Sequence, residues 1–545
     1  MADFIEHFRQ YKLEIQQRQP SFEMIQNICS REESSKDIDK PQEAENIPLE
    51  FNSMNPSPQI DQDSIEYGVK ECIIPILLVL AMATYTENYE FLFGSIVAFA
   101  FIYSKFYESI PNLFRNFTLV FICGVVLYLS NGEYYQLAAM MVLVYAPFHT
   151  LLKEYSGSFN LVDIFSLLVF NCIFLIFWAE NFWKFWQIGI QNKDLDEYEP
   201  FDGDQLNSLG DIPEVLLYFS PYVILNFSGV LFGISLCISS RKTEKYFKAY
   251  CLCFVIVSTM ILFCVMVAVS LLSSSEFNIL TFLMSELSRI LTSGVFWYMF
   301  FCLPLCLIGI AKYTGDDVFM TRKLFHFTAL ALFLPAVIAN QKIMVFGSNL
   351  AIVLFIIIEF SKKYSSGTCL AKIHEYEETY LDDREKNRDG LVLSHLFLLL
   401  GCSIGTISSY ILLDGDDFDF NAVLYSLSGL IFVGIGDSMA ALGGRSFGMT
   451  KWPGRHKSRE GSIFCICAYM FTYVLALIFV QALSSTKNQH FPGYLYIGIE
   501  IFISGVIATI VEALTYQFDN FLCPQICFSF IVLIDHCFQE FILDL

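Results

Sequence analysis

The sequence has few charged residues: Asp, Glu, Lys and Arg make up only 16% of its 545 residues, whereas a soluble domain carries roughly 25%. In their place, 55% of the residues are hydrophobic, and from Cys72 onward they form long apolar runs without a polar face. A helix that crosses a bilayer needs about 20 apolar residues, and the core helices of soluble proteins are amphipathic. The pattern therefore excludes a soluble globular protein and predicts an all-α, polytopic integral membrane protein.

Several common motifs are also missing. The 17 cysteines contain no pair of CxxC motifs and stand mostly inside apolar runs, where cysteine acts as a small hydrophobe, so we expect no zinc site. No GxxxxGK[ST] sequence occurs, which excludes a P-loop. Residues 1–66 are polar and lack a short apolar core near their start, so no signal peptide is expected.

Acidic residues outnumber basic ones, giving a formal net charge of -22. The excess is concentrated in residues 1–69, with fourteen acids and six bases, and in a second cluster at 194–214. Such segments are solvated and repel phosphate, which argues against a nucleic-acid partner. We expect residues 1–69 to be an acidic, disordered cytoplasmic tail.

The apolar runs predict about 15 transmembrane helices. They fall into a multi-span N-terminal half, residues 70–312, and a C-terminal half, residues 313–545, which carries nearly all the distinctive polar residues. The expected cores are 71–86, 90–104, 117–130, 135–152, 159–178, 218–240, 248–272, 290–312, 324–340, 344–360, 391–413, 421–441, 462–483, 493–511 and 521–540.

The loop charges predict the orientation. From Lys312 onward, alternate loops contain fourteen Lys and Arg residues, whereas the intervening loops contain only Lys342 and Lys487. Basic loops face the cytoplasm, and the alternation traced backward places the N-terminus there too. The same alternation puts six polar clusters at the cytoplasmic face, those around Arg322, His395, Asp437, Lys457, Glu512 and Asp519.

The most distinctive polar segment is residues 434–462, which reads GIGDSMAALGGRSFG and then, after two residues, KWPGRHKSREGS. Asp437 follows an apolar run, and an ionisable residue in or at the edge of a membrane is costly and usually functional. Four glycines allow close backbone approach; they are Gly436, Gly443, Gly444 and Gly448.

A Pro453-Gly454 turn then leads to a basic cluster and to Ser458, which is suited to cap the next helix. A helix N-terminus, glycines and several cations together suit a polyphosphate. Asp437 and Glu460 are candidate ligands for a Mg²⁺ ion that bridges it. The alternative is a basic loop that only sets topology, with Gly443 and Gly444 used for helix packing.

The remaining candidates each have two interpretations. Arg322 and Lys323 are candidate phosphate ligands or helix-end cations that reach to the interface. His326 and His395 are candidate general bases or phosphate partners, or structural hydrogen bonders. Glu512 and Asp519 are seven residues apart, which predicts that they share one face of a helix as a second metal or ribose site; the alternative is helix capping.

The segment GDSMAALGGRSFG…WPGRHKSREGS resembles the signature of the CTP-dependent polyprenol kinases, and of the dolichol kinases above all. Three further segments resemble dolichol kinase blocks in the same order, namely residues 322–326, 388–401 and 512–520. The resemblance covers roughly residues 310–540. The long N-terminal half fits the dolichol kinases better than phytol kinases or CTP-dependent diacylglycerol kinases.

The resemblance implies transfer of the γ-phosphoryl group of CTP to the terminal hydroxyl of dolichol, giving dolichyl phosphate for glycan-carrier lipids and CDP. It implies Mg²⁺, the endoplasmic reticulum membrane and an active site that faces the cytoplasm. Asp437 matches the family's GD aspartate, and with Lys457, Glu460, His326 and His395 it forms the expected catalytic set. Six residues match the family's nucleotide-binding loop, namely Trp452, Pro453, Gly454, Lys457, Glu460 and Gly461, and the candidates Arg455, His456, Ser458 and Arg459 lie in the same loop.

One departure concerns phosphate binding. Dolichol kinases usually read Thr-Lys-Lys-Thr where this chain reads Arg455-His456-Lys457-Ser458. Histidine is largely neutral at pH 7, so Arg455 or Arg459 is expected to supply the missing charge.

Three alternatives remain open. The first is a CTP-dependent kinase or cytidylyltransferase that acts on another lipid, such as phytol, diacylglycerol or phosphatidate. The second is a transporter, which would place charges at mid-membrane and usually contain internal repeats; no convincing repeat is visible. The third is a catalytically dead scaffold. The oligomeric state is not addressed by the sequence.

Overall fold

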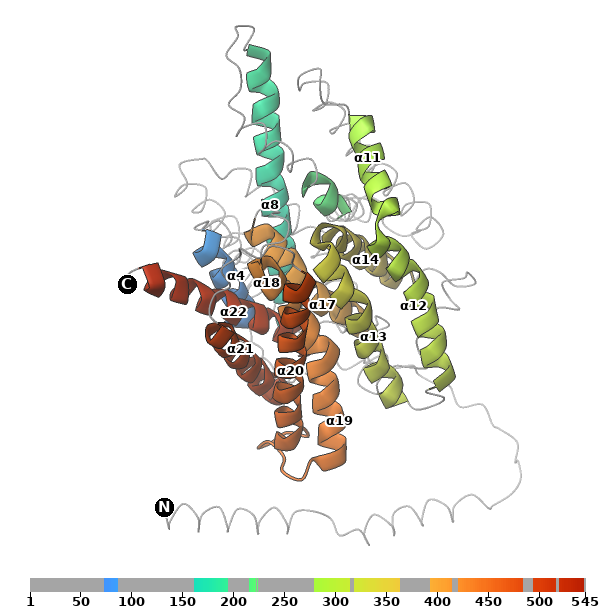
Figure 1. The fold of residues 1–545 in the computed structure, drawn as a ribbon, viewed down its shortest axis with the longest axis vertical. Helices are drawn as coiled ribbons and strands as arrows, with labels where there is room; N and C mark the ends of the chain where they lie inside the picture. The colour runs from blue at the N-terminus through green and yellow to red at the C-terminus, as the bar shows by residue number, and fades with distance from the viewer. Residues whose placement is uncertain are drawn as a thin grey trace, which may run out of the picture. The chain divides into compact units, whose positions relative to one another are not determined.

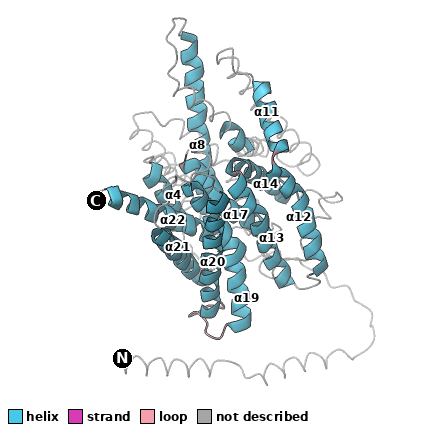
Figure 2. Cartoon of the chain, in the orientation of Figure 1, coloured by secondary structure: helices cyan, strands magenta, loops and turns pink. Residues whose placement is uncertain are grey.

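All regular elements that the structure describes are helices (Figures 1 and 2). The structure is a computed structural model, and it describes residues 73–86, 161–194, 215–221, 223, 279–313, 318–362, 393–413, 420–483, 494–515 and 519–543. Within these ranges no β-strand forms, and a single isolated bridge joins Lys451 and Ser458. The all-α prediction is confirmed for this part of the chain.

Most helices of the C-terminal half lie close to the expected cores, whereas the helix that begins at Leu161 runs to Asp194, past the expected end at 178, and residues 279–292 form a helix that was not expected. The helices are α4 (Ile73–Thr86), α8 (Leu161–Asp194), α11 (Ile279–Thr292), α12 (Gly294–Tyr313), α13 (Val318–Ala339), α14 (Gln341–Lys362), α17 (Leu393–Leu412), α18 (Phe420–Ile431), the π-helix η1 (Phe432–Gly436), α19 (Asp437–Phe447), α20 (Arg459–Leu483), α21 (Tyr494–Leu514) and α22 (Asp519–Leu543).

Among the described residues, seven helical segments are long and apolar enough to cross a membrane. Six of them lie in the C-terminal half, at the positions that hydropathy predicted; the predicted span 421–441 continues without a break to Phe447. The expected cores 90–104, 117–130, 135–152 and 248–272, and the tail 1–69, lie outside the described residues. The total of about 15 spans and the cytoplasmic N-terminus therefore stay predictions.

The first turn of α22 is fixed where it crosses α17 and α18 at two glycines. A methyl group at Gly401 of α17 would overlap the backbone oxygen of Asn520, and one at Gly429 of α18 would lie 2.7 Å from the backbone oxygen of Gly401. Only a hydrogen atom fits between such backbones, as in other close helix crossings within membranes. The position of Asn520 is thus set by packing inside the bundle.

A π-turn precedes the aspartate of the predicted site. Residues Phe432–Gly436 form η1, which ends with the backbone N–H of Asp437 donating to the oxygen of Phe432. The extra residue in this turn rotates everything after it by about 100° relative to an uninterrupted α-helix. In η1, a methyl group at Gly434 would lie 2.6 Å from Cβ of Leu330, so α13 packs directly on this turn. The turn therefore sets the direction of the Asp437 side chain and places this part of the chain against α13.

Gly401→Ala is expected to lower the free energy of unfolding by about 1–3 kcal/mol, because the added methyl overpacks the crossing. Gly498→Ala is the matched control: nothing lies within 4 Å of a methyl group there, and alanine should be neutral or stabilise α21 by about 0.5–1 kcal/mol. Thermal unfolding of both purified variants in detergent measures the difference. Equal stability would contradict the close crossing at Gly401.

Candidate active site

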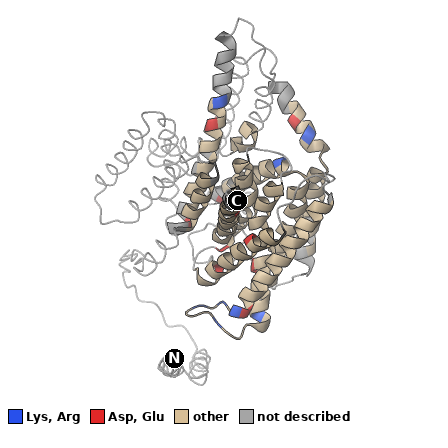
Figure 3. Cartoon of the chain, turned by 60° about the vertical axis from the view of Figure 1, so that its left-hand side comes forward, with Lys and Arg blue, Asp and Glu red and all other residues tan. Residues whose placement is uncertain are grey.

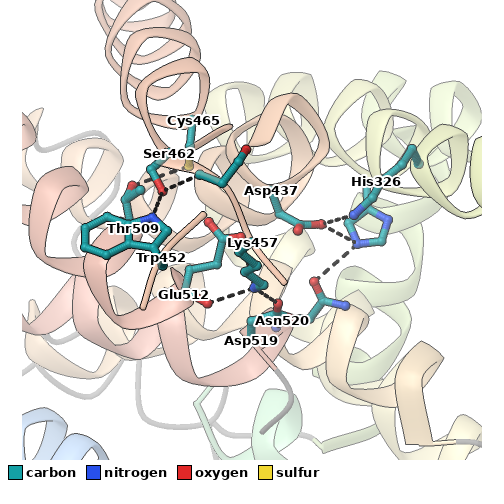
Figure 4. Close-up of polar contacts among 12 residues, drawn as sticks. His326, Asp437, Trp452, Lys457, Ser462, Cys465, Thr509, Glu512, Asp519 and Asn520 are labelled. Carbon is teal, nitrogen blue, oxygen red and sulfur yellow. Dashed lines mark hydrogen bonds and ion pairs between the residues drawn. The ribbon is translucent and has the colours of Figure 1, made fainter. Parts of the chain in front are cut away.

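Asp437, the first residue of α19, lies at the centre of a polar cluster between the ends of apolar helices (Figure 4). Its side-chain Oδ2 is 2.6 Å from Nζ of Lys323 and 3.3 Å from Nε2 of His326. Both partners come from α13, where they are three residues apart and so share a face. Asp437 is only 8% exposed, and a buried carboxylate requires such partners.

His326 joins three helices. Its Nδ1 lies 2.8 Å from the backbone oxygen of Arg322 in the preceding turn of α13, and its Nε2 lies 3.2 Å from Oδ1 of Asn520 in α22. A backbone carbonyl only accepts hydrogen bonds, so Nδ1 donates. With Asp437 also in contact with Nε2, both ring nitrogens are engaged, and the buried ring is held in one orientation.

Lys457 reaches from the loop between α19 and α20 to two acidic residues. Its Nζ donates to Oδ2 of Asp519 at 2.6 Å, to Oε1 of Glu512 at 3.1 Å and to the backbone oxygen of Glu512 at 2.8 Å. Burial alone would lower the pKa of Lys457, but the carboxylates of Asp519 and Glu512 raise it well above its usual value. Lys457 is therefore a permanent cation.

Three acidic side chains form a candidate metal site. Asp437, Glu512 and Asp519 each offer one carboxylate oxygen, and these atoms all lie within 4.8 Å of one another. Hard oxygen ligands of this kind suit Mg²⁺. Three of the four predicted metal ligands are thus brought together, from α19, α21 and α22. They fit a divalent cation in ligand chemistry and in spacing.

Glu460, the fourth predicted ligand, is placed differently. Its two carboxylate oxygens accept hydrogen bonds from the backbone N–H of Thr450, at 3.0 and 3.1 Å. This contact ties the start of α20 to the loop, and Glu460 is not one of the three clustered acids. A role of Glu460 as a metal ligand stays a prediction. The contact that the structure shows anchors the loop at Thr450.

One predicted relation between acids is wrong. Glu512 and Asp519 do not share the face of one helix, because Glu512 lies in the last turn of α21 and Asp519 begins α22. They meet since the chain leaves α21 at Leu514 and enters a new helix at Asp519. The two acids do lie close together, but they do so across the junction of two helices and not on one helix face.

The loop itself is a short hairpin. The backbone N–H of Trp452 donates to the oxygen of Lys457 at 3.0 Å, and that of Arg455 donates to the oxygen of Trp452 at 3.0 Å. Gly454 has a φ of 68°, which together with Pro453 before it makes a type II turn. The hairpin presents Lys457 to α21 and α22; the blue colour of Lys and Arg positions marks it in Figure 3.

The indole of Trp452 makes contacts that stabilise this hairpin. Its Nε1 donates to Oγ of Ser462 at 3.0 Å, and the guanidinium of Arg459 lies 5.7 Å from the centre of its ring. Ser458 Oγ accepts from the N–H of Gly461 at 3.1 Å, so the predicted helix cap is confirmed. These contacts hold the hairpin to the start of α20.

The predicted glycines lie mainly at contacts between α19 and α20. A methyl group at Gly443 would lie 2.5 Å from the ring of Phe464, and one at Gly461 would lie 2.6 Å from the backbone oxygen of Ala440. Gly444 and Gly448 pack on Ser458, and Gly436 packs on Cys465. These glycines pack helices against each other, which is the alternative that the sequence left open. Their contact with a nucleotide stays a prediction.

The other candidates surround this cluster. The ring of His395 in α17 lies 6.3 Å from that of Phe325, the neighbour of His326. Arg455 is half-buried and His456 is exposed in the hairpin. Sequence reasoning gave no role to Asn520, although it closes the block 512–520 that resembles the dolichol kinases, and it missed the pairing of Lys323 with Asp437.

Lys457→Met is expected to loosen the hairpin, because two carboxylates lose their cation while the methionine keeps most of the side-chain volume. The free energy of opening of residues 450–458 should fall by about 1–3 kcal/mol, measured as faster backbone hydrogen exchange. Lys451→Met is the matched control, since Lys451 is an exposed lysine of the same hairpin. Equal protection in both variants would contradict the role of Lys457 as the anchor.

Comparisons with known proteins support the resemblance. The chain is 29% identical to the dolichol kinase of Mus musculus over 208 residues, 38% of this chain and 36% of that protein. It is 30% identical to the dolichol kinase of Bos taurus over 209 residues, again 38% and 36% of the two chains. It is 25% identical to the dolichol kinase EVAN of Arabidopsis thaliana over 257 residues, 47% of this chain and 42% of that protein.

The chain thus spans between a third and a half of the length of these curated relatives. No family profile matches the chain, and no solved structure matches it either. The matches with the curated relatives confirm that the chain resembles the dolichol kinase family, as its motifs indicated.

Proposed function

We propose that the protein transfers the γ-phosphoryl group of CTP to the terminal hydroxyl of dolichol, giving dolichyl phosphate and CDP. The observation that carries the proposal is the convergence of Asp437, Glu512 and Asp519 with the cations Lys323 and Lys457. Similarity to dolichol kinases supports the choice of a lipid alcohol as acceptor. Phosphoryl transfer needs this kind of site, because it depends on positioning and charge neutralisation more than on covalent help.

The surroundings suit a substrate that stays in the bilayer. Apolar side chains of α20 point outward, as expected for a lipid-facing helix; Phe471 is 71% exposed and Ile478 is 56% exposed. The acidic cluster lies at the end of this helix that carries the hairpin. A site at such an edge lets a water-soluble nucleotide meet a hydroxyl whose lipid tail remains among apolar helices.

Cations on two sides suit the polyphosphate of CTP. Lys323 approaches from α13 and Lys457 from the hairpin, with Arg455 and Arg459 nearby in the sequence. Asp437, Glu512 and Asp519 would hold Mg²⁺, which when bound neutralises phosphate charge and polarises the phosphoryl group. The lysines neutralise the carboxylates and, in this proposal, also contact phosphate oxygens.

In the proposed reaction, the hydroxyl oxygen of dolichol forms a bond to the γ-phosphorus. The bond from that phosphorus to the β,γ-bridging oxygen breaks, and its electron pair leaves with CDP. The hydroxyl proton passes to a carboxylate oxygen of the acidic cluster, as it passes to an aspartate in other phosphoryl transfers. His326 has both ring nitrogens engaged, so we assign it to orienting Asp437.

The proposed location is the endoplasmic reticulum membrane, with the site on the cytoplasmic side. The basic loops of the C-terminal half support this orientation, since the hairpin that contributes Lys457 is one of them. A cytoplasmic site also has direct access to CTP. The product would serve the synthesis of glycan-carrier lipids.

Purified protein with labelled CTP, Mg²⁺ and dolichol is expected to yield labelled dolichyl phosphate and CDP. Asp437→Asn should lower turnover by about 10²–10³-fold, because the charge that positions the reacting groups is lost. Asp535→Asn makes the same change in α22, about 24 Å along that helix from Asp519, and should keep activity per folded protein. Thin-layer chromatography of the lipid and nucleotide products measures both.

Other products would redirect the proposal. Release of pyrophosphate instead of CDP would indicate a cytidylyltransferase, and labelling of diacylglycerol or phytol but not dolichol would indicate a different acceptor. Full activity of Asp437→Asn would contradict the proposed role of Asp437 in catalysis. A purified, folded protein that is inactive with every one of these lipids would overturn the enzyme assignment.

A further inference from the structure

The His326 side chain is placed to control Asp437, and its own position depends on a residue from another helix. The ring is anchored at Nδ1 by the Arg322 oxygen, 2.8 Å away on its own helix. A hydrogen bond at Nδ1 alone would not stop the ring from swinging about that atom. What limits the swing lies at Nε2, where Asn520 approaches to 3.2 Å and Asp437 to 3.3 Å.

Asn520 is itself held in place by its backbone. Its N–H donates to Oδ1 of the neighbouring Asp519 at 3.0 Å, and its carbonyl oxygen packs against Gly401 so closely that a methyl group has no room there. The backbone of Asn520, from which its short amide side chain extends, is therefore fixed in position. The side chain extends to His326, as Figure 4 shows.

The dipeptide Asp519-Asn520 thus contacts both Lys457 of the hairpin and His326, the partner of Asp437. Asp519 accepts from Lys457 of the hairpin, and Asn520 contacts His326, which contacts Asp437. An amide suits this position because it bonds to the imidazole without adding charge next to three carboxylates. Partners of this kind, one shell away from a ligand, orient the ligand and tune its affinity for a metal ion.

We propose that Asn520 is a positioning residue that fixes the ring of His326 and, through it, directs Asp437 toward Glu512 and Asp519. This inference rests on the proposed function for its effect on turnover. Its effect on the geometry of the acidic cluster does not depend on the substrate, because the chain of contacts lies wholly within the protein.

The test compares Asn520→Ala, His326→Ala and the double variant in the full-length protein. Each single change should lower the turnover number by about 10–100-fold and weaken Mn²⁺ binding, followed by electron paramagnetic resonance, by a similar factor. Because Asn520 acts through His326, the double variant should be no more than about threefold worse than His326→Ala. The KM for CTP should change less than the turnover number.

Asn340→Ala is the matched control. Asn340 also uses its side-chain oxygen in a hydrogen bond, accepting from the N–H of Ile343 at 3.0 Å. It follows the last residue of α13, about 21 Å along the helix from His326, so turnover and Mn²⁺ binding should equal those of the wild type. Should Asn520→Ala fail to fold, Asn520→Ser, which suits a first helical turn but cannot reach His326, replaces it.

Two results would overturn the inference: wild-type Mn²⁺ binding and turnover in Asn520→Ala, or a double variant whose loss equals the product of the single losses. The second result would mean that Asn520 acts independently of His326. A wild-type protein that does not phosphorylate dolichol would instead defeat the proposed function. Mn²⁺ binding needs no lipid or nucleotide, so it would still decide whether Asn520 positions Asp437.

Discussion

The contact of Lys457 with Asp519 and Glu512 is the interaction on which the rest of the site depends. Carboxylates whose oxygens lie within 4.8 Å of one another repel, and in an apolar setting they do not stay charged without nearby cations. Lys457 supplies one cation from the hairpin and Lys323 supplies another from α13. The acids can therefore be concentrated at one place only because two separate segments deliver lysines to it.

The fold supplies what this concentration of charge requires. The hairpin must be rigid, and its type II turn, the cap at Ser458 and the anchor at Glu460 make it so. The start of α22, which carries Asp519, must pack closely in the bundle. Gly401 lets the backbone of α22 meet that of α17, and Gly429 lets α18 meet the backbone of α17 and the side chain of Pro524. Glycines that pack helices thus determine where charges lie, which links the apolar core directly to the site.

Hydropathy and motifs predicted the helices of the C-terminal half and the segment that carries Asp437, because both are local properties of the chain. The cap at Ser458 was predictable for the same reason. The partners of Asp437 and Lys457 were not, since they lie 114 and 62 residues away along the chain. Helices that are apolar all round carry little periodic signal about which neighbour each face meets.

One predicted relation between residues was wrong. Glu512 and Asp519 were placed on one helix because a spacing of seven fits two turns, although the expected cores 493–511 and 521–540 already left both acids between two spans. Glu460 as a metal ligand stays a prediction from its position in the motif, and the contact that the structure shows joins its oxygens to the backbone N–H of Thr450. A motif identifies which residues act together, but the tertiary contacts decide what each one does.

The departure from the usual lysine pair acquires a physical meaning in this arrangement. Aligned with the Thr-Lys-Lys-Thr pattern, His456 takes the place of the first lysine and Lys457 that of the second. Lys457 makes the contacts with Asp519 and Glu512, whereas His456 is exposed near the tip of the hairpin. The lysine that neutralises the acids is retained, and the lysine that is replaced faces solvent. The substitution therefore changes the charge at the exposed end of the hairpin and leaves the acidic cluster intact.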